Sequence, residues 1–200
     1  PKSFNALNWD MVKALLDITI QLKNTTEIRA VVLRGAGKNF MAGGDIKGFK
    51  TFLNGTTTAS AIQSEFEGEL EEIHKVIYNM RMLPIPIIAI IRGAAAGAGL
   101  SFVLASDLAL CTEKAFFTLA YSRIGTSPDG GSTFFLPRNV GLKRAMEIAL
   151  LSNRFDAQKA FELGLVNYMV ADEEIENETS ILLKKITLKL VFQVFPKIVQ

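Results

Sequence analysis

The chain has 200 residues, of which 49% are hydrophobic and 21% charged, which is ordinary for a globular protein able to bury a core. Lys and Arg number 22 against 20 Asp and Glu, and no basic cluster forms, so the composition argues against nucleic-acid binding. One cysteine excludes an intramolecular disulfide, and with a single histidine it cannot supply a zinc-type ligand set. We therefore expect no metal and a cytoplasmic protein (mitochondrial matrix or peroxisome if eukaryotic).

The first half of the chain alternates helical and strand-like patterns. Apolar residues recur every three or four positions in two segments, and compact apolar runs predict buried strands between them. The most apolar run, 85–91, contains Pro86 and is too short to span a bilayer, so we expect no membrane partner. The expected elements are a helix capped by Asn8, a strand at 30–33, a Gly-rich loop at 35–48, a helix at 62–80 and a strand at 87–91.

The second half continues the alternation, which favours an α/β architecture. The expected elements are a small-residue run at 93–99, a helix at 100–105, strands at 107–111 and 115–118, a turn-rich loop at 125–131, helices at 142–151 and 157–163 and a strand at 166–170. No linker divides the chain, so we predict a single domain over 1–200 with its core at about 1–180. Both ends look truncated, because no strand precedes Pro1 and the apolar run 188–199 has no cap.

Two Gly- and Ala-rich segments, 40–46 and 93–99, each follow a predicted strand. Small side chains would let a ligand oxygen reach backbone N–H groups, which is what a developing oxyanion requires. Taken alone, either segment is equally compatible with a tight turn or close helix packing. Nucleotide binding is disfavoured, because Phe102 stands where a dinucleotide fingerprint needs glycine and Val32 where a P-loop needs one.

The two segments together, with their flanks, resemble the crotonase (enoyl-CoA hydratase/isomerase) family over roughly 1–180. The matching segments are Ala42-Gly43-Gly44-Asp45-Ile46, Arg92 through Gly99, Ser106-Asp107, Phe117 through Tyr121, Ile124-Gly125, Pro128 through Thr133, Leu136-Pro137-Arg138, Gly141 and Gly164-Leu165-Val166. The resemblance implies a spiral of ββα turns with two roughly perpendicular sheets and C-terminal helices that mediate trimers. The C-terminal helical region here is apparently incomplete, and a homotrimer or a dimer of trimers is the expected assembly.

The resemblance also implies a site for an acyl-CoA substrate, with no separate cofactor. By motif position, the backbone N–H groups of Ala42 and Ala98 would form the oxyanion hole. The remaining substrate-binding residues would be Gly43, Gly44, Asp45, Ile46, Gly97 and Tyr121.

The acidic residues select among the reactions of the family. Hydratases that resemble this chain use two glutamates, at the positions of Ser101 and Tyr121 here, and neither side chain can replace a carboxylate base at neutral pH. Asp129 remains, in a loop similar to that of enoyl-CoA isomerases, and we expect burial to raise its pKa. The sequence thus predicts an isomerase that shifts a double bond (Δ3 to Δ2, or ring-type) by a 1,3-proton transfer through a dienolate, with Asp129 as catalytic residue.

Other interpretations stay open at this stage. A hydratase with an unusual water site and a non-catalytic acyl-CoA-binding protein are the alternatives, and Pro-Asp-Gly is also a common turn sequence. Asp45 is expected to orient its loop rather than act as a base, and His74 to be a surface residue. Residues proposed to line an acyl pocket are Phe49, Phe52, Ile62, Phe66 and Phe134.

Overall fold

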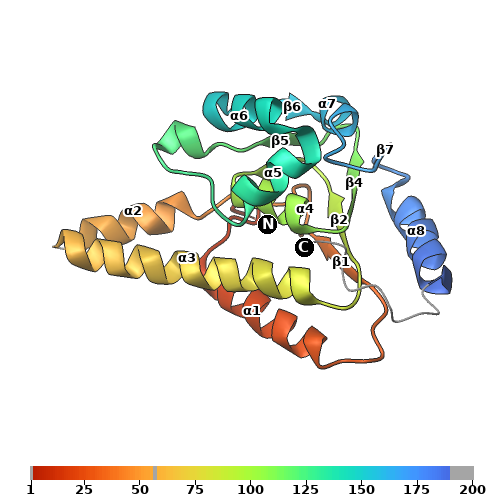
Figure 1. The fold of residues 1–200 in the computed structure, drawn as a ribbon, viewed down its shortest axis with the longest axis horizontal. Coiled ribbons are helices and arrows are strands. Elements are labelled where there is room, and N and C mark those ends of the chain that lie inside the picture. Colours follow the sequence, from red (N-terminus) through yellow and green to blue (C-terminus); the bar gives the residue numbers. More distant parts are fainter. Residues whose placement is uncertain (1, 56–57, 190–200) are drawn as a thin grey trace.

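The computed structural model describes residues 2–55 and 58–189 (Figure 1). Its helices are α1 (Trp9–Lys23), α2 (Ile46–Gly55), α3 (Ala59–Met82), α4 (Ala98–Ala105), the 3-10 helix η1 (Tyr121–Ile124), α5 (Ser132–Val140), α6 (Leu142–Leu151), α7 (Ala157–Glu162) and α8 (Ile175–Lys189). Its strands are β1 (Val31–Arg34), β2 (Ile87–Ile91), β3 (Ala94–Ala96), β4 (Leu108–Thr112), β5 (Phe116–Thr118), β6 (Phe155–Asp156) and β7 (Tyr168–Val170). The predicted α/β class is confirmed.

The strands of the described ranges form two sheets. The first is wholly parallel, in the order β1-β2-β4-β7, and the second has the order β3-β5-β6 with β6 antiparallel. Strands β2 and β3 are separated only by Arg92 and Gly93, so the chain passes directly from the first sheet into the second. This passage delivers the start of α4 to the place where the Gly-rich loop after β1 also arrives.

Strand β2 is fully buried because both of its faces are covered. Its residues Ile87, Ala89 and Ile91 belong to the main core, which also includes α3 and α4. Ile88 and Ile90 face a smaller core that contains Ile175 and Leu182 of α8. Figure 1 shows α8 on the opposite side of the parallel sheet from α3. A continuous apolar run is what two-sided burial of a parallel strand requires.

Helices α1 and α3 run side by side below the parallel sheet (Figure 1). Asn8 caps α1 by accepting from the N–H of Met11 at 3.0 Å, as predicted. Helix α3 is tied to the sheet at its end, where Arg81 pairs with Asp107 at 2.9 Å and the other Asp107 oxygen accepts from Ile87 N at 2.8 Å. No helix within 2–55 and 58–189 is long and apolar enough to cross a membrane.

Several elements were not predicted. The expected loop at 35–48 gives way to α2 at Ile46, and the small-residue run at 93–99 contains strand β3. Helices α5 and α8 were not expected either, although Ser132 and Ile175 begin regular helices. The apolar run at 188–199 lies outside the described residues from 190 onward.

Close packing of α4 against the loop after β1 gives a prediction for stability. A Cβ on Gly99 would lie 2.2 Å from Met41 O, whereas one on Gly68, in the exposed part of α3, would meet nothing within 4 Å. We expect Gly99→Ala to lower the free energy of unfolding by roughly 1–3 kcal/mol or more. Gly68→Ala, the same change in another helix, should raise it by about 0.5–1 kcal/mol. Denaturant melts measure both, and equal effects would contradict the proposed packing.

Candidate active site

The loop after β1 is held against the second sheet by backbone hydrogen bonds. Met41 N donates to Ala94 O at 2.9 Å, and Ala96 N donates to Met41 O at 2.9 Å, which forms a bridge to β3. Side-chain bonds add to this, since Asn39 Oδ1 accepts from Ala94 N at 3.0 Å. The loop therefore has a fixed register beside the strand that leads into α4.

The two Gly-rich segments touch at Gly43 and Gly97. A Cβ on Gly97 would lie 3.5 Å from Gly43 Cα, and one on Gly43 would lie 3.2 Å from Ala96 O. Both residues have positive φ, +97° at Gly43 and +49° at Gly97, which L-residues with side chains rarely adopt. The backbone conformation therefore favours glycine at both positions, and at Gly43 the close approach of Ala96 O adds to this preference.

The residues that directly follow Gly43 and Gly97 have backbone N–H groups that are available to a ligand. Among the described residues, neither Gly44 N nor Ala98 N donates a hydrogen bond, and both residues line the same cavity. Ala98 is the first residue of α4, where the helix dipole places partial positive charge. Two unpaired N–H groups of this kind can stabilise an oxyanion.

The predicted role of Ala42 needs correction. Its N–H donates to Phe4 O at 3.1 Å, so its single hydrogen is already used, although Ala42 does line the cavity. The N-terminal segment returns alongside the loop here, with Leu7 N donating to Gly43 O at 2.7 Å and Asp45 N to Leu7 O at 2.9 Å. This pairing leaves the Gly44 amide as the unpaired donor of the loop.

Asp45 stabilises the start of α2, whereas we expected it to orient the loop in which it lies. Its Oδ1 accepts from Gly48 N at 3.1 Å, which is the hydrogen bond of a helix N-cap. Asp45 and Ile46 also line the cavity. The sequence contained this signal, because Asp followed by a helical segment is a common start of a helix.

Asp129 lies in the loop between η1 and α5. Gly130 and Gly131 follow it with φ of +56° and +76°, and a Cβ on Gly130 would lie 2.9 Å from Ser101 Cβ in α4. The carbonyl of Asp129 accepts from Ser132 N at 3.0 Å and from Ser101 Oγ at 3.2 Å. The backbone of this loop is therefore packed directly onto α4, close to Ala98.

The side chain of Asp129 accepts a short hydrogen bond at Oδ1 from the Tyr121 hydroxyl. Burial raises the pKa of the Asp129 carboxyl, while the bond from Tyr121 and the charge of His74 act in the opposite direction. Burial, followed by the negative charge of Asp129, raises the pKa of the Tyr121 phenol. Tyr121 therefore stays protonated and acts as a donor.

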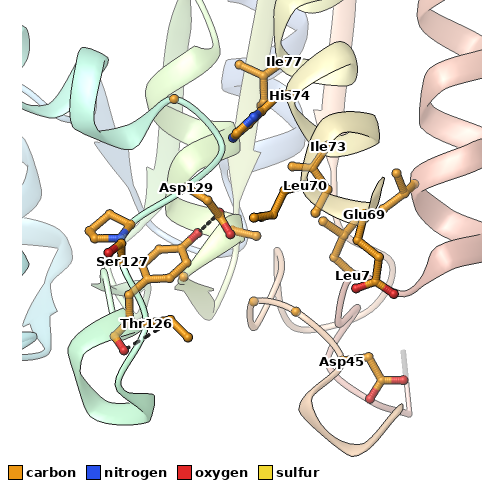
Figure 2. A pocket seen from close by; sticks show the side chains of 18 of the residues that line it. Leu7, Asp45, Glu69, Leu70, Ile73, His74, Ile77, Thr126, Ser127 and Asp129 are labelled. Atoms are coloured by element: carbon orange, nitrogen blue, oxygen red, sulfur yellow. Dashed lines mark hydrogen bonds between the residues drawn. The ribbon is translucent and has the colours of Figure 1, made fainter. Parts of the chain in front are cut away.

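These features surround one cavity of about 1120 Å³. Figure 2 shows Asp129 and His74 pointing into it from opposite walls, with Leu70 and Ile73 of α3 nearby. The structure brings all nine predicted site residues to this cavity: Ala42, Gly43, Gly44, Asp45, Ile46, Gly97, Ala98, Tyr121 and Asp129. Three of the proposed pocket residues, Phe49, Phe66 and Phe134, line it, while Ile62 does not, and the side chain of Phe52 lies outside the described residues.

Sequence reasoning missed several polar residues of the cavity wall, among them Glu69, His74, Tyr78 and Arg81 of α3. His74 is exposed, as expected, but it is exposed to the cavity and its charge reaches Asp129. The helical period alone could not reveal this, because it marks the polar face without saying what lies opposite. No group of His, Cys, Asp and Glu residues in the described part of the chain could hold a metal.

An α/β fold that sets Gly-rich backbone amides opposite a buried carboxylate is typical of the crotonase superfamily. A family model described as "Enoyl-CoA hydratase/isomerase" matches residues 1–199. The chain belongs to this family.

Curated relatives with different reactions match the chain almost equally well. It is 35% identical over 177 residues to a probable enoyl-CoA hydratase of Rhodobacter capsulatus and to 4-chlorobenzoyl coenzyme A dehalogenase-1 of Arthrobacter sp, covering 88% of this chain and 65% and 62% of theirs. It is 33% identical over 175 residues to the 1,2-epoxyphenylacetyl-CoA isomerase of Escherichia coli, covering 88% and 65%. The chain thus spans somewhat less than two thirds of the length of these relatives.

Solved structures match in fold. An enoyl-CoA hydratase of Mycobacterium smegmatis superposes with a TM-score of 0.86 at 32% identity, over 94% of this chain and 70% of that one. One from Bacillus anthracis gives 0.84 at 30% identity, over 92% and 69%.

The raised pKa of Asp129 predicts a stability effect. Between the ordinary value of 3.8 and its folded pKa, the folded state keeps a proton that the unfolded chain releases, so stability falls as the pH rises through this window. Asp129→Asn removes the penalty, and we expect its free energy of unfolding at pH 7 to exceed that of the wild type by about 0.5–2 kcal/mol. Thermal melts from pH 7 downward should show the gain shrinking toward pH 3.8.

Asp156→Asn is the matched control, because Asp156 caps α7 outside the cavity and Asn caps a helix equally well. An equal gain in this variant would assign the effect to net charge. No gain in Asp129→Asn would show that burying the carboxyl carries no penalty.

Proposed function

We propose that the protein is an acyl-CoA isomerase that moves a double bond of an enoyl-CoA, Δ3 to Δ2 or within a ring, by a 1,3-proton transfer. The observation that carries the proposal is the half-buried Asp129 carboxylate in a cavity that also exposes the unpaired amides of Gly44 and Ala98. Ser101 and Tyr121 occupy the two positions where hydratases resembling this chain carry glutamates.

The chemistry follows from this arrangement. The thioester oxygen binds between the amides of Gly44 and Ala98, next to the start of α4. The Asp129 carboxylate takes a proton from C2, and the electron pair moves through a dienolate whose negative charge rests on the thioester oxygen. Asp129, now protonated, returns the proton at C4. One acid performs both transfers, and no activated water takes part.

The raised pKa of Asp129 suits both halves of the reaction. A carboxylate of ordinary pKa is a weak base, whereas burial makes the anion a stronger one and lets the acid hold its proton until C4 receives it. The other acids of the cavity wall are placed differently. Asp45 caps α2, and Glu69 lies on α3 next to Leu70 (Figure 2).

A second candidate is a reaction in which water enters the site, as in hydration. His74 favours it, because a titratable group in the cavity acts electrostatically on Asp129. A panel of 3-enoyl-CoA, crotonyl-CoA and 4-chlorobenzoyl-CoA separates the outcomes. Isomerised product from the first substrate alone supports the proposal, hydrated product or halide from the others supports the second candidate, and binding without turnover would support an acyl-CoA-binding protein.

We propose no cofactor besides the CoA of the substrate, and a homotrimer or dimer of trimers acting in the cytoplasm. The exposed apolar face of α6, formed by Leu142, Met146 and Leu150, supports association between subunits. Sedimentation velocity on the purified protein tests the assembly.

Asp129→Asn should lower the isomerase kcat by at least about 10²–10⁴-fold, because the proton carrier is lost. Binding of a saturated acyl-CoA, measured by calorimetry, should stay within about threefold of the wild type, since the amides and the cavity remain. Asp156→Asn, the same substitution outside the cavity, is the control and should keep full turnover. An active Asp129→Asn variant would refute the assignment.

The amide donors can be tested with proline, because Ala98 is the first residue of α4 and proline is tolerated at this position. Ala98→Pro removes one N–H from the proposed oxyanion hole, and kcat should fall by about 10²–10³-fold while circular dichroism stays unchanged. Ala59→Pro makes the same change at the exposed first residue of α3 and should leave kcat intact. Equal activity of the two folded variants would exclude Ala98 N as a donor.

A further inference from the structure

We infer that Tyr121, supported by Ser101, is a positioning residue that holds Asp129 with one oxygen fixed and the other turned to the substrate. The inference rests on the isomerase function proposed above and assigns a use to the two positions that hydratases fill with glutamates. In this chain the side chains of Tyr121 and Ser101 are hydrogen-bonded to each other and to Asp129.

The first support is the placement of the Tyr121 side chain. Tyr121 opens η1 and is only 8% exposed, although its phenol reaches the cavity wall. The preceding Ala120 has φ 59° and ψ −10°, a left-handed conformation that alanine rarely adopts. This strained residue directly precedes Tyr121 and directs its phenol toward Asp129. Strained backbone is often found at functional sites.

The second support is Ser101, which joins three elements. Its Oγ lies 3.3 Å from the Tyr121 hydroxyl, donates to Asp129 O at 3.2 Å and is also within reach of Gly97 O at 3.4 Å. Ser101 is 1% exposed and sits on the same helix, α4, whose first amide is the proposed donor at Ala98. Ser101 therefore fixes the positions of the Tyr121 phenol and the Asp129 backbone relative to α4, the helix proposed to bind the thioester oxygen.

The third support is that the two carboxyl oxygens of Asp129 have different surroundings. Oδ1 accepts from Tyr121, and within the described residues no hydrogen bond is made to Oδ2. The phenol can donate to Oδ1 whether the carboxyl is ionised or carries the substrate's proton on Oδ2. The bond therefore persists through both proton transfers, and a single oxygen serves C2 and C4 without rotation of the side chain.

The hydrogen bond also sets the pH at which Asp129 works. A donor stabilises the carboxylate more than the acid, so the phenol moderates the increase in pKa caused by burial. The other titratable or charged groups that line the cavity are Asp45, Glu69, His74, Tyr78 and Arg81. Removing the phenol hydroxyl leaves all of them in place, so a change in the pH profile reports on this bond.

Tyr121→Phe is the decisive variant, because it deletes one oxygen and keeps the ring. Loss of a hydrogen bond to a charged group should lower kcat by roughly tenfold or more, with KM within about threefold of the wild type. The acid limb of the kcat/KM profile should move to higher pH, since the base must lose its proton without the help of the phenol. Ser101→Ala should act in the same direction but less strongly, and the double variant should add little to Tyr121→Phe.

Tyr168→Phe, on the exposed end of β7, is the matched control and should change neither kcat nor the pH profile. Carboxyl ¹³C NMR of aspartate-labelled protein, with Asp129→Asn for assignment, gives a readout without substrate. The Asp129 signal should titrate at higher pH in Tyr121→Phe than in the wild type, and an unchanged titration would overturn the positioning role.

The two proposals fail separately in these experiments. If Asp129→Asn abolishes turnover but Tyr121→Phe keeps the wild-type kcat and acid limb, the isomerase assignment stands and the positioning role is wrong. If the wild type isomerises no substrate but the NMR titration still moves in Tyr121→Phe, the hydrogen bond positions Asp129 for another reaction and the isomerase assignment is wrong.

Discussion

The site depends on the contact between Gly43 and Gly97, where two backbones meet in conformations that residues with side chains rarely adopt. Each segment reaches this point from a strand of the parallel sheet, one after β1 and the other after β2 by way of β3. The contact places the next amides, at Gly44 and Ala98, on the wall of one cavity. The positive φ of both glycines, together with the 3.2 Å that would separate a Cβ on Gly43 from Ala96 O, therefore sets the geometry of the two amides.

The architecture could be predicted from local patterns, but some elements depend on contacts distant in sequence. Strand β2 could be predicted because it is an unbroken apolar run, and Asn8 and Asp156 mark the starts of their helices. Helix α2 was hidden because glycines at 43, 44 and 48 resemble a loop, although Asp45 caps it. The apolar residues of α8 pack against the second face of the parallel sheet. A contact between such distant segments cannot be recognised from a short stretch of sequence.

Local sequence patterns were also insufficient to predict the individual hydrogen bonds of the site. The motif identified the loop that carries a donor, but the unpaired amide is that of Gly44 because Phe4, far away in sequence, occupies the amide of Ala42. Similarly, the sequence identified the turn around Asp129, but the hydrogen bond from Tyr121 depends on tertiary structure, which brings Tyr121 of η1 beside Ser101 of α4. Sequence patterns thus place residues in a neighbourhood, while the hydrogen-bond partners within it are decided by tertiary structure.

Under the proposed isomerase function, the side chains of Ser101 and Tyr121 also bear on the choice between proton transfer and addition of water. Two glutamates at these positions would leave charged oxygens able to bind and deprotonate water, whereas the two hydroxyls here bond to each other and to Asp129. The hydroxyl hydrogens of both residues are directed to groups of the protein, and neither hydroxyl is a carboxylate base that could deprotonate water. In the proposed mechanism, a dienolate formed beside this wall is reprotonated by Asp129, the same acid that created it. We therefore propose that Ser101 and Tyr121 deprive the site of a hydratase's base and leave intact the proton carrier that an isomerase needs, Asp129.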